Sequence, residues 1–374
     1  MRDGAYGVNE GDGFFFLFSS ANNINIEEKY NETMLRSFID LDKKCKEYGC
    51  RLLVIPAVPA KCHALTRLIP FFRETGFSDY GRETLVRDLL KNGIPAIDTQ
   101  SFLNGIVSPD KISYTFNSTT DGHFSSTTNA LLADRVASLL LKKKEYEYSF
   151  NKGYFTLMSP FFQFYKGKVQ VDVSPKFAKK PTVNENAKGI LIVGDSFVTT
   201  NGFNQHLQSM CPVPVATFNR GAGANMQMRE VMLGKKDEEL KKTSMLIFIY
   251  FNSYASHIWP TAASTYCEQH LNEGKLVSVK PNKEKDLVIP YPDDFGEQAI
   301  VLLELPALTG TYSISNHGKK VFAYDSKFEY GSNTMLAISV NKTECVNGNI
   351  VLSFDIVPTI KSVRLFNKSK SLIP

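Results

Sequence analysis

Two unbroken apolar segments constrain the fold of this chain more than any other feature. Residues 189–193 read Gly-Ile-Leu-Ile-Val and residues 245–251 read Met-Leu-Ile-Phe-Ile-Tyr-Phe, with no charged position in either. Such short runs, rich in β-branched and aromatic residues, indicate strands that are buried on both faces. A third run, 51–56, follows an amphipathic helix predicted over residues 28–50. Strands covered on both faces are typical of parallel sheets flanked by helices, so the sequence predicts an α/β fold.

The alternation of helix and strand continues up to about residue 250. Helices are predicted around residues 81–91 and over 129–144, and further strands at 94–98 and 213–218. Residues 145–186 are aromatic, rich in lysine and interrupted by prolines, which indicates an excursion from the sheet with one short hairpin. We therefore expect a three-layer α/β/α domain with a mainly parallel sheet.

The character of the sequence changes near residue 287, where helical periodicity ends. Short β-type runs then recur at roughly ten-residue spacing, which is typical of a small sandwich. These runs are 299–305, 310–315, 320–324, 335–340, 350–356 and 362–366. Gly274 and the polar stretch 281–286 indicate a linker near 275–286, so we predict a first domain over 1–280 and a β-rich domain over 281–374.

Composition excludes several classes of function. The net charge of +5 comes from 43 basic and 38 acidic residues spread along the chain, which disfavours a nucleic acid partner. The six cysteines lack the short double spacing of a zinc site, and we expect no metal and no cofactor. Buried free thiols and a disulfide such as Cys45 with Cys50 both stay open. The apolar run 14–18 is too short to span a bilayer.

Ser196 is the candidate nucleophile because it follows a buried strand directly, in Gly194-Asp195-Ser196. Its hydroxyl is expected at the carboxyl end of the sheet, where open α/β folds bind their ligands. Its backbone N–H, at the start of a helix, could stabilise an oxyanion. The alternative is that Ser196 only caps the following helix.

A serine hydroxyl needs a base, and Asp121-Gly122-His123 supplies the best candidate among the six histidines. A carboxylate two residues away can fold back onto the imidazole Nδ1, which leaves Nε2 free to take a proton from Ser196. We therefore predict a Ser-His-Asp site for acyl transfer. The alternative for Asp121 and His123 is surface chemistry or metal ligation.

The order of these motifs resembles the alginate O-acetyltransferase family, whose SGNH-hydrolase-like domain carries its Asp and His before its Ser. Residues 12–16 (Asp-Gly-Phe-Phe-Phe) resemble the family's opening element, and residues 58–61 (Val-Pro-Ala-Lys) its Pro-x-Lys segment. Residues 93–98 (Gly-Ile-Pro-Ala-Ile-Asp) are similar to the element before Asp-x-His. The resemblance runs in order over roughly two thirds of the chain.

The resemblance implies a role for each motif residue. Ser196 would carry the acetyl group, His123 would act as general base and acid, and Asp121 would orient His123. The block Asn219-Arg220-Gly221-Ala222-Gly223 is similar to the family's glycine-bearing block, so Gly221 or Gly223 would supply a second oxyanion N–H. Asn252, after a strand, is a further candidate donor. The acceptor would be a polysaccharide, the acetyl donor would be relayed from a membrane-bound acyltransferase, and the location would be the periplasm or cell envelope, with the leader or anchor outside this chain.

Two positions depart from the family pattern. Phe124 stands where the family usually has Trp after Asp-x-His, which keeps an aromatic residue beside the base. The arginine expected after the strand that ends near Phe251 is missing, so the polymer need not be alginate. The C-terminal β-rich segment resembles, in position only, the carbohydrate-binding module that some family members carry, and its Tyr324, Phe328 and Tyr330 could stack on sugars or pack in a core.

Three alternatives to an acetyltransferase stay open. A carbohydrate esterase would use the same triad, because only the exclusion of water from the acceptor site separates transfer from hydrolysis. A non-catalytic polysaccharide-binding or assembly protein would retain the fold and bind sugar without forming an acetyl-enzyme. A metal-dependent site at Asp121 and His123 would lose activity to a chelator.

Overall fold

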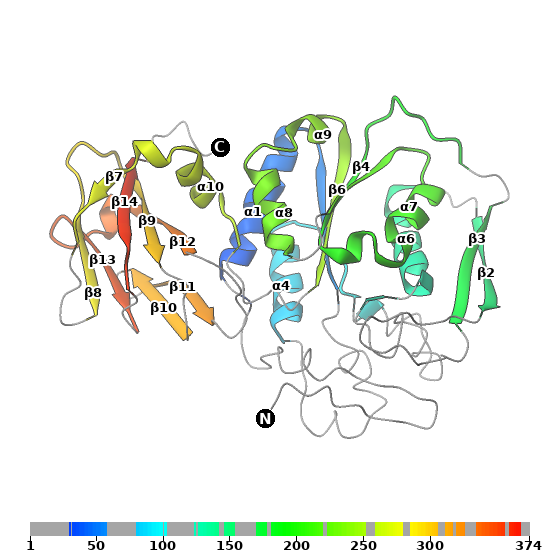
Figure 1. Cartoon of the computed structure of the whole chain (residues 1–374), viewed down its shortest axis with the longest axis horizontal. Helices are drawn as coiled ribbons and strands as arrows, with labels where there is room; N and C mark the ends of the chain where they lie inside the picture. The colour runs from blue at the N-terminus through cyan, green and yellow to red at the C-terminus, as the bar shows by residue number, and fades with distance from the viewer. Residues whose placement is uncertain are drawn as a thin grey trace, which may run out of the picture. The chain divides into compact units, whose positions relative to one another are not determined.

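The structure is a computed structural model of the chain. It describes residues 30, 32–57, 80–99, 101–102, 123–124, 126–141, 146–153, 170–177, 181–219, 223–251, 259–279, 285–305, 311–316, 319–325, 334–355 and 359–367. The chain divides into two compact units, each built from segments that are separated in sequence (Figure 1). The first unit contains the described residues within Cys45–Gln227 and Asp237–Tyr254. The second contains those within Tyr30–Lys44, Met228–Lys236 and Ala255–Pro374.

A four-stranded parallel sheet forms the centre of the first unit, as the apolar runs predict. Its spatial order is β1 (Arg51–Ala57), β6 (Thr243–Phe251), β4 (Gly189–Gly194) and β5 (Val215–Asn219). The strand predicted at 94–98 is wrong. That segment touches the sheet through a single bridge from Ala96 to Val54, since Pro95 has no N–H to continue a ladder.

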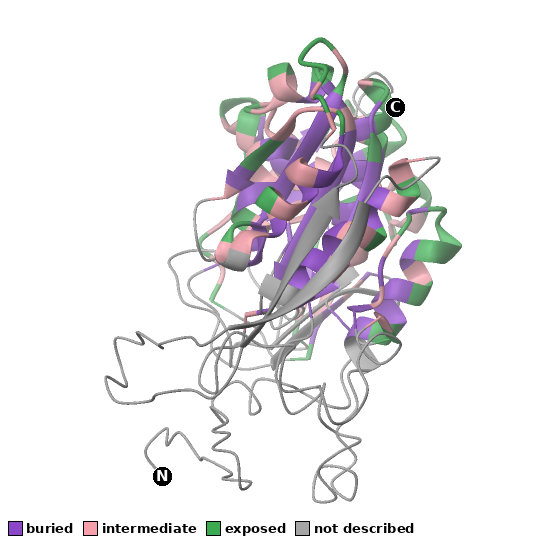
Figure 2. Cartoon of the chain, turned by 90° about the vertical axis from the view of Figure 1, so that its right-hand side faces the viewer, coloured by how far each residue is buried: buried purple, intermediate pink, exposed green. Residues whose placement is uncertain are grey.

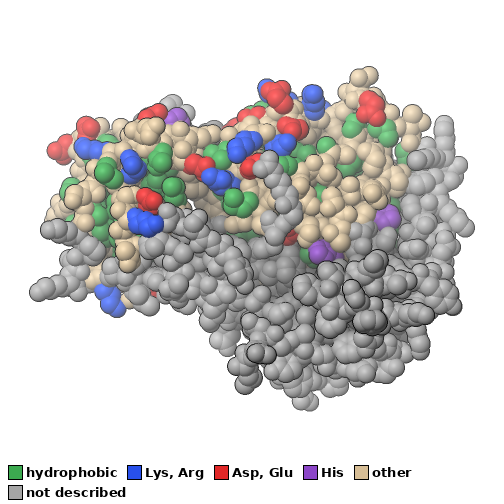
Figure 3. All heavy atoms as spheres, in the orientation of Figure 1, with side chains coloured by type: hydrophobic (Ala, Val, Ile, Leu, Met, Phe, Trp, Pro, Cys, Tyr) green, Lys and Arg blue, Asp and Glu red, His purple; other side chains and the backbone are tan. Residues whose placement is uncertain are grey.

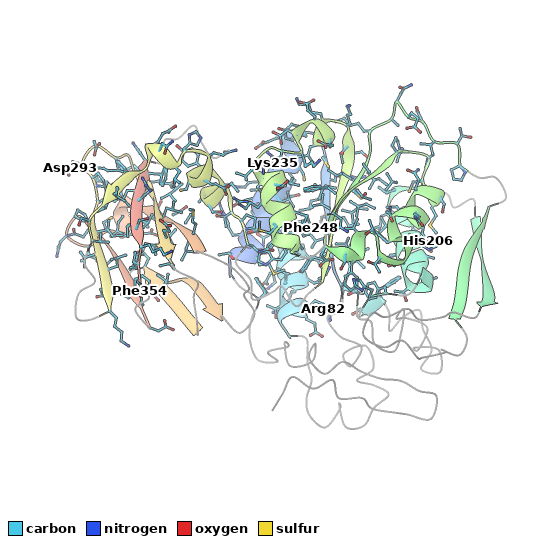
Figure 4. The ribbon with its side chains drawn as sticks, in the orientation of Figure 1. Arg82, His206, Lys235, Phe248, Asp293 and Phe354 are labelled. Carbon is cyan, nitrogen blue, oxygen red and sulfur yellow. The ribbon has the colours of Figure 1, made fainter. Side chains whose placement is uncertain are left out.

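Helices cover both faces of this sheet, which confirms the three-layer α/β prediction. Ile190 and Ile192 of β4 pack in a core with α6 (Ser126–Leu140) and α7 (Phe203–Met210). Leu191 and Val193 point to the opposite face and are equally buried. On that side Figure 1 shows α4 (Tyr80–Lys91) and the short helix α9 (Asp237–Lys241). Figure 2 colours most of the sheet as buried, with the edge strand β5 partly exposed, and Figure 4 labels the buried Phe248 of β6.

The excursion between α6 and the central strand β4 contains the predicted hairpin. Strands β2 (Tyr146–Gly153) and β3 (Gln170–Phe177) pair antiparallel over their whole length.

A glycine-terminated turn joins α1 (Glu32–Glu47) to β1. Gly49 has φ +67°, and the Cys50 N–H donates to the Cys45 carbonyl over 2.9 Å, which is a Schellman ending. The two cysteine side chains therefore occupy the positions that contact each other in this motif. Both are buried free thiols, so of the two alternatives left open by the sequence the disulfide is not formed. A hydrogen bond from Cys45 lowers the pKa of the Cys50 thiol.

The second unit contains a β-sandwich, which confirms the β-type C-terminal prediction. One sheet has the order β11 (Lys319–Asp325), β10 (Thr311–Asn316), β13 (Asn349–Phe354) and β8 (Asp286–Pro290). The other has the order β12 (Thr334–Asn341), β9 (Gln298–Leu305), β14 (Ser362–Asn367) and β7 (Lys275–Val277). Apolar side chains of both sheets share one core, in which Leu287 comes from the first sheet and Leu303 from the second. Figure 4 labels Phe354, which belongs to the same core.

The linker predicted at 275–286 is corrected by two of these strands. Its first residues form β7, which pairs with β14, and its last residue begins β8, which pairs with β13. Alternation over so few residues is too short to separate an edge strand from a polar loop. A domain boundary near residue 280 stays a prediction.

The second unit also includes helical segments that precede the sandwich in sequence. Trp259, the only tryptophan of the chain, is buried and packs on Phe38 of α1 with ring centroids 5.5 Å apart. Asp40 of α1 accepts the first backbone N–H of α10 (Ala262–Gln269) over 2.8 Å. Arg229 donates from Nε to Glu268 of α10 over 2.7 Å. Short 3-10 helices occur at Leu271–Glu273 (η6) and Lys342–Glu344 (η8).

Candidate active site

The peptide geometry at the end of β4 explains why Gly194 precedes the candidate nucleophile. Gly194 has φ +156°, and a Cβ built on it would lie 1.7 Å from the backbone oxygen of Ile249 on the neighbouring strand β6. Only glycine allows the two strands to stay in register at this point. The chain then leaves the sheet at Asp195 and enters a 3-10 helix, η3 (Ser196–Val198), with Ser196 as its first residue.

Asp195, not Ser196, caps this short helix. The Asp195 Oδ1 accepts the Phe197 backbone N–H over 2.9 Å, and the Asp195 residue is only 2% exposed. The alternative in which the Ser196 hydroxyl serves as the cap is therefore wrong. The hydroxyl is available for another partner.

That partner is His123. The Nε2 atom of His123 lies 2.6 Å from the Oγ atom of Ser196, although the two residues are far apart in the chain. The separation is within the range for a nucleophile and its general base. A neutral imidazole that accepts from Ser196 at Nε2 carries its proton on Nδ1, which is the arrangement that a carboxylate at Nδ1 would stabilise.

Two phenylalanine rings pack on one side of this pair. The ring of Phe197 lies 4.8 Å from the imidazole of His123, centroid to centroid, with an interplanar angle of 37°. Phe124 meets the same Phe197 ring edge-on at 5.2 Å, and both phenylalanines are buried. Ser196 and His123 are themselves half-buried. The pair thus has an apolar wall on one side, which strengthens hydrogen bonds and charge interactions next to it.

The other predicted site residues are only partly placed. Asp121, Gly221 and Asn252 lie outside the described residues. Gly223 has φ +93° and directly precedes α8 (Ala224–Met232), but no described contact joins it to Ser196. Asn219, the last residue of β5, is in register with Gly194, so the glycine-bearing block begins at the same edge of the sheet as Ser196. The roles of these residues stay predictions.

Asp195 and Phe197 are the site residues that sequence reasoning missed. An aspartate between a buried strand and a helix is an N-cap pattern, and this signal was available in the sequence. The partner of the Phe197 ring was not, because His123 reaches it from a distant segment.

Within the described ranges, no group of three or more His, Cys, Asp or Glu side chains is placed to hold a metal ion. In the same ranges, none of the helices combines the length and apolar character needed to cross a membrane. Figure 3 shows basic and acidic side chains interspersed on the face in view.

Comparison with known proteins gives similarity of structure. No family model matches the sequence, and no curated protein matches it. Two solved structures resemble this chain. The structure of AlgX from Pseudomonas aeruginosa has a TM-score of 0.47 and 12% identity, and the match covers 97% of this chain and 94% of that one. The O-acetyltransferase domain of AlgJ from Pseudomonas putida has a TM-score of 0.46 and 13% identity, with 68% of this chain and 93% of that one covered.

The AlgX match extends through the β-sandwich of this chain, whereas the AlgJ match covers a shorter part.

Proposed function

We propose that this protein is a serine-dependent O-acetyltransferase that transfers acetyl groups to hydroxyls of an extracellular polysaccharide. The observation that supports the proposal most directly is the 2.6 Å separation of Ser196 Oγ and His123 Nε2. A serine that only caps a helix is structural, but a serine paired with an imidazole at the carboxyl edge of a parallel sheet fits nucleophilic catalysis.

The first half-reaction loads the enzyme. Ser196 Oγ attacks the acetyl carbonyl carbon of the donor while its proton moves to His123 Nε2. The tetrahedral intermediate then collapses, the bond to the donor's leaving group breaks, and that group takes the proton from His123. The result is acetyl-Ser196 and a neutral imidazole.

The second half-reaction delivers the acetyl group. A sugar hydroxyl attacks the acetyl carbon of acetyl-Ser196, and His123 accepts the hydroxyl proton. When the bond to Ser196 Oγ breaks, the proton returns to that oxygen, and the acetylated sugar leaves. Water in place of the sugar would turn the same sequence into ester hydrolysis, which is the esterase alternative.

Charge develops on the carbonyl oxygen and on the imidazole in both halves. The Ser196 backbone N–H is at the first position of η3, where a helix offers no internal acceptor, so it is the first proposed oxyanion donor. Gly221 or Gly223 is the proposed second donor, and Asn252 a third. Asp121 is proposed to hold the Nδ1 proton of His123 and to stabilise the imidazolium.

The proposed setting follows the family resemblance. The polysaccharide acceptor, the relay of acetyl groups from a membrane-bound acyltransferase, and the periplasm or cell envelope are all part of the proposal. The β-sandwich is a candidate carbohydrate-binding module. Of its candidate aromatics, Tyr324 lies in β11, and Phe328 and Tyr330 lie outside the described residues.

Intact-protein mass spectrometry after incubation with an activated acetyl ester tests the proposal. We expect one acetyl adduct on the wild type, none on Ser196→Ala, and a rate lower by about 10²- to 10⁴-fold for His123→Ala. The adduct should discharge faster in the presence of an acidic oligosaccharide, which gains the acetyl group.

Each other outcome favours a named alternative. Discharge to water alone, unaffected by oligosaccharides, would identify an esterase. No adduct and no turnover, with sugar binding unchanged in Ser196→Ala, would identify a binding or assembly protein. Loss of turnover on addition of a chelator would point to a metal site.

A further inference from the structure

We infer that two asparagines, Asn129 and Asn219, are positioning residues that hold the nucleophile turn against His123. The inference rests on the proposed function, since it concerns the same Ser196–His123 pair. Both side chains donate to the two residues that follow η3, and they do so from different elements of the first unit.

The segment that carries Ser196 needs outside support. It consists of two consecutive 3-10 helices, η3 and η4 (Thr200–Gly202), joined through Thr199. Within it, the Thr199 N–H reaches the Ser196 carbonyl over 3.3 Å and the Gly202 N–H reaches the Thr199 carbonyl over 3.2 Å. Short 3-10 turns have poorer hydrogen-bond geometry than α-helices, so their position depends on the surrounding structure.

Asn129 links this segment to the helix that follows His123. Its Nδ2 donates to the Thr200 carbonyl over 2.9 Å, and the residue is 1% exposed. It lies in the first turns of α6, which begins three residues after His123. The hydrogen bond therefore joins the base-bearing segment to the nucleophile-bearing segment at a point close in sequence to both. The Asn129 Oδ1 is also buried, and among the described residues no group donates a hydrogen bond to it. The hydrogen bond that this amide makes to the described residues is therefore the donation to Thr200.

Asn219 supplies the second restraint. Its Nδ2 donates to the Thr199 Oγ1 over 3.1 Å from the end of β5. Thr199 and Thr200 are thus held from two sides, by the strand next to β4 and by the helix next to His123. Two restraints on adjacent residues fix both the position and the rotation of the turn, and hence the direction of the Ser196 hydroxyl.

The consequence is a rate effect on chemistry. Misplacement of a reacting group by about 1 Å costs on the order of 100-fold in rate. We expect Asn129→Ala and Asn129→Asp to lower the single-turnover rate of Ser196 acetylation by about 10- to 100-fold. The aspartate has the same shape but cannot donate to a carbonyl when ionised. Binding of a small activated ester should change little, because the two side chains donate to Thr200 and Thr199 and not to Ser196 or His123.

The assay is stopped-flow release of nitrophenolate from p-nitrophenyl acetate, with the adduct per chain counted by mass spectrometry. The matched control is Val136→Ala, a buried position two turns further along α6 that lowers stability without removing a hydrogen bond to the turn. Asn219→Ala is the second variant. Its contact with Thr199 is exposed, so the protein should fold even where Asn129 variants do not.

The inference is supported if the asparagine variants are acetylated slowly but bind the ester with unchanged affinity. Val136→Ala should then be acetylated at the wild-type rate although its melting temperature is similar to that of the asparagine variants. It is overturned if the asparagine variants lose only melting temperature and acetylate within about twofold of the wild type, since about tenfold is the smallest loss expected of misplacement. A wild type that reacts with no ester would overturn the proposed function and this inference with it, whereas a reactive wild type with equally reactive variants would overturn this inference alone.

Discussion

Replacing Gly194 by alanine is the most direct test of how the sheet positions the nucleophile. An ordinary van der Waals contact begins at 3.4 Å, and the new Cβ would lie 1.7 Å from the Ile249 carbonyl oxygen, so it is 1.7 Å too close. The oxygen belongs to the backbone of β6, which is paired on both sides. The strand cannot yield easily, so the displacement falls on the turn that carries Ser196.

The size of the effect follows from that distance. A shift of about 1 Å in a reacting group costs on the order of 100-fold in rate, so Gly194→Ala should lower the acetylation rate of Ser196 by at least about 100-fold. The backbone conformation at φ +156° adds strain of about 1–3 kcal/mol for a residue with a side chain. The single-turnover ester assay measures the rate, and thermal unfolding measures the stability.

Gly93→Ala is the matched control. Gly93 also has a positive φ, +73°, but nothing lies within 4 Å of a Cβ added there. It should cost roughly 1–2 kcal/mol of stability and leave the acetylation rate unchanged. If Gly194→Ala acetylated within a few-fold of Gly93→Ala, the argument that β6 fixes the position of Ser196 would be refuted.

Three further predictions concern stability and thiol chemistry. Asp40→Ala removes the charged acceptor for the first N–H of α10, whose N-cap is Thr261, and should cost about 1.5–3 kcal/mol, and Asp40→Asn less. Urea unfolding followed by tryptophan fluorescence compares the two variants, and equal losses would contradict a contribution from the charge of this acceptor. Asp98 pairs with Arg82, which is fully buried and labelled in Figure 4. Asp98→Ala should therefore cost about 3 kcal/mol, and adding Arg82→Met should restore part of that loss. A double variant no more stable than the single one would show that the other partners of Arg82, such as Glu83 at 3.9 Å, balance its charge without Asp98. Burial raises the pKa of the Cys211 and Cys267 thiols to about 12, so iodoacetamide near neutral pH should label neither thiol in the folded protein. Peptide mass spectrometry measures the labelling, and labelling of both at the rate of an exposed thiol would be inconsistent with their buried positions.

Local sequence patterns predicted most elements because burial imposes a period that the residues must follow. The runs at 189–193 and 245–251 became β4 and β6, and all six β-type runs after residue 287 became strands of the sandwich. Sequence reasoning gave no bounds for the helices α7, α8, α9 and α10, and among the strands it missed β7 and β8, which have three and five residues. Such short segments hold too few alternating positions to be distinguished from loop.

The candidate site could be predicted in part for a different reason. Ser196 stood out because it follows a buried strand, and His123 because a carboxylate accompanies it in the sequence. The cap by Asp195 could also be predicted, because this aspartate stands between a buried strand and a helix. The sequence does not predict the contact of Phe197 with the imidazole or the hydrogen bond from Asn129 to Thr200, because each joins segments about seventy residues apart.

The sequence by itself determined which residues could do chemistry and which segments had to be buried, since residue type and periodicity are local properties. Only the tertiary structure decided that β6 lies between β1 and β4, that its Ile249 carbonyl requires glycine at 194, and that His123 meets Ser196 at 2.6 Å. Strand order and side-chain contact depend on how distant segments pack together, and the free energy of that packing belongs to the whole core and not to any one stretch of residues.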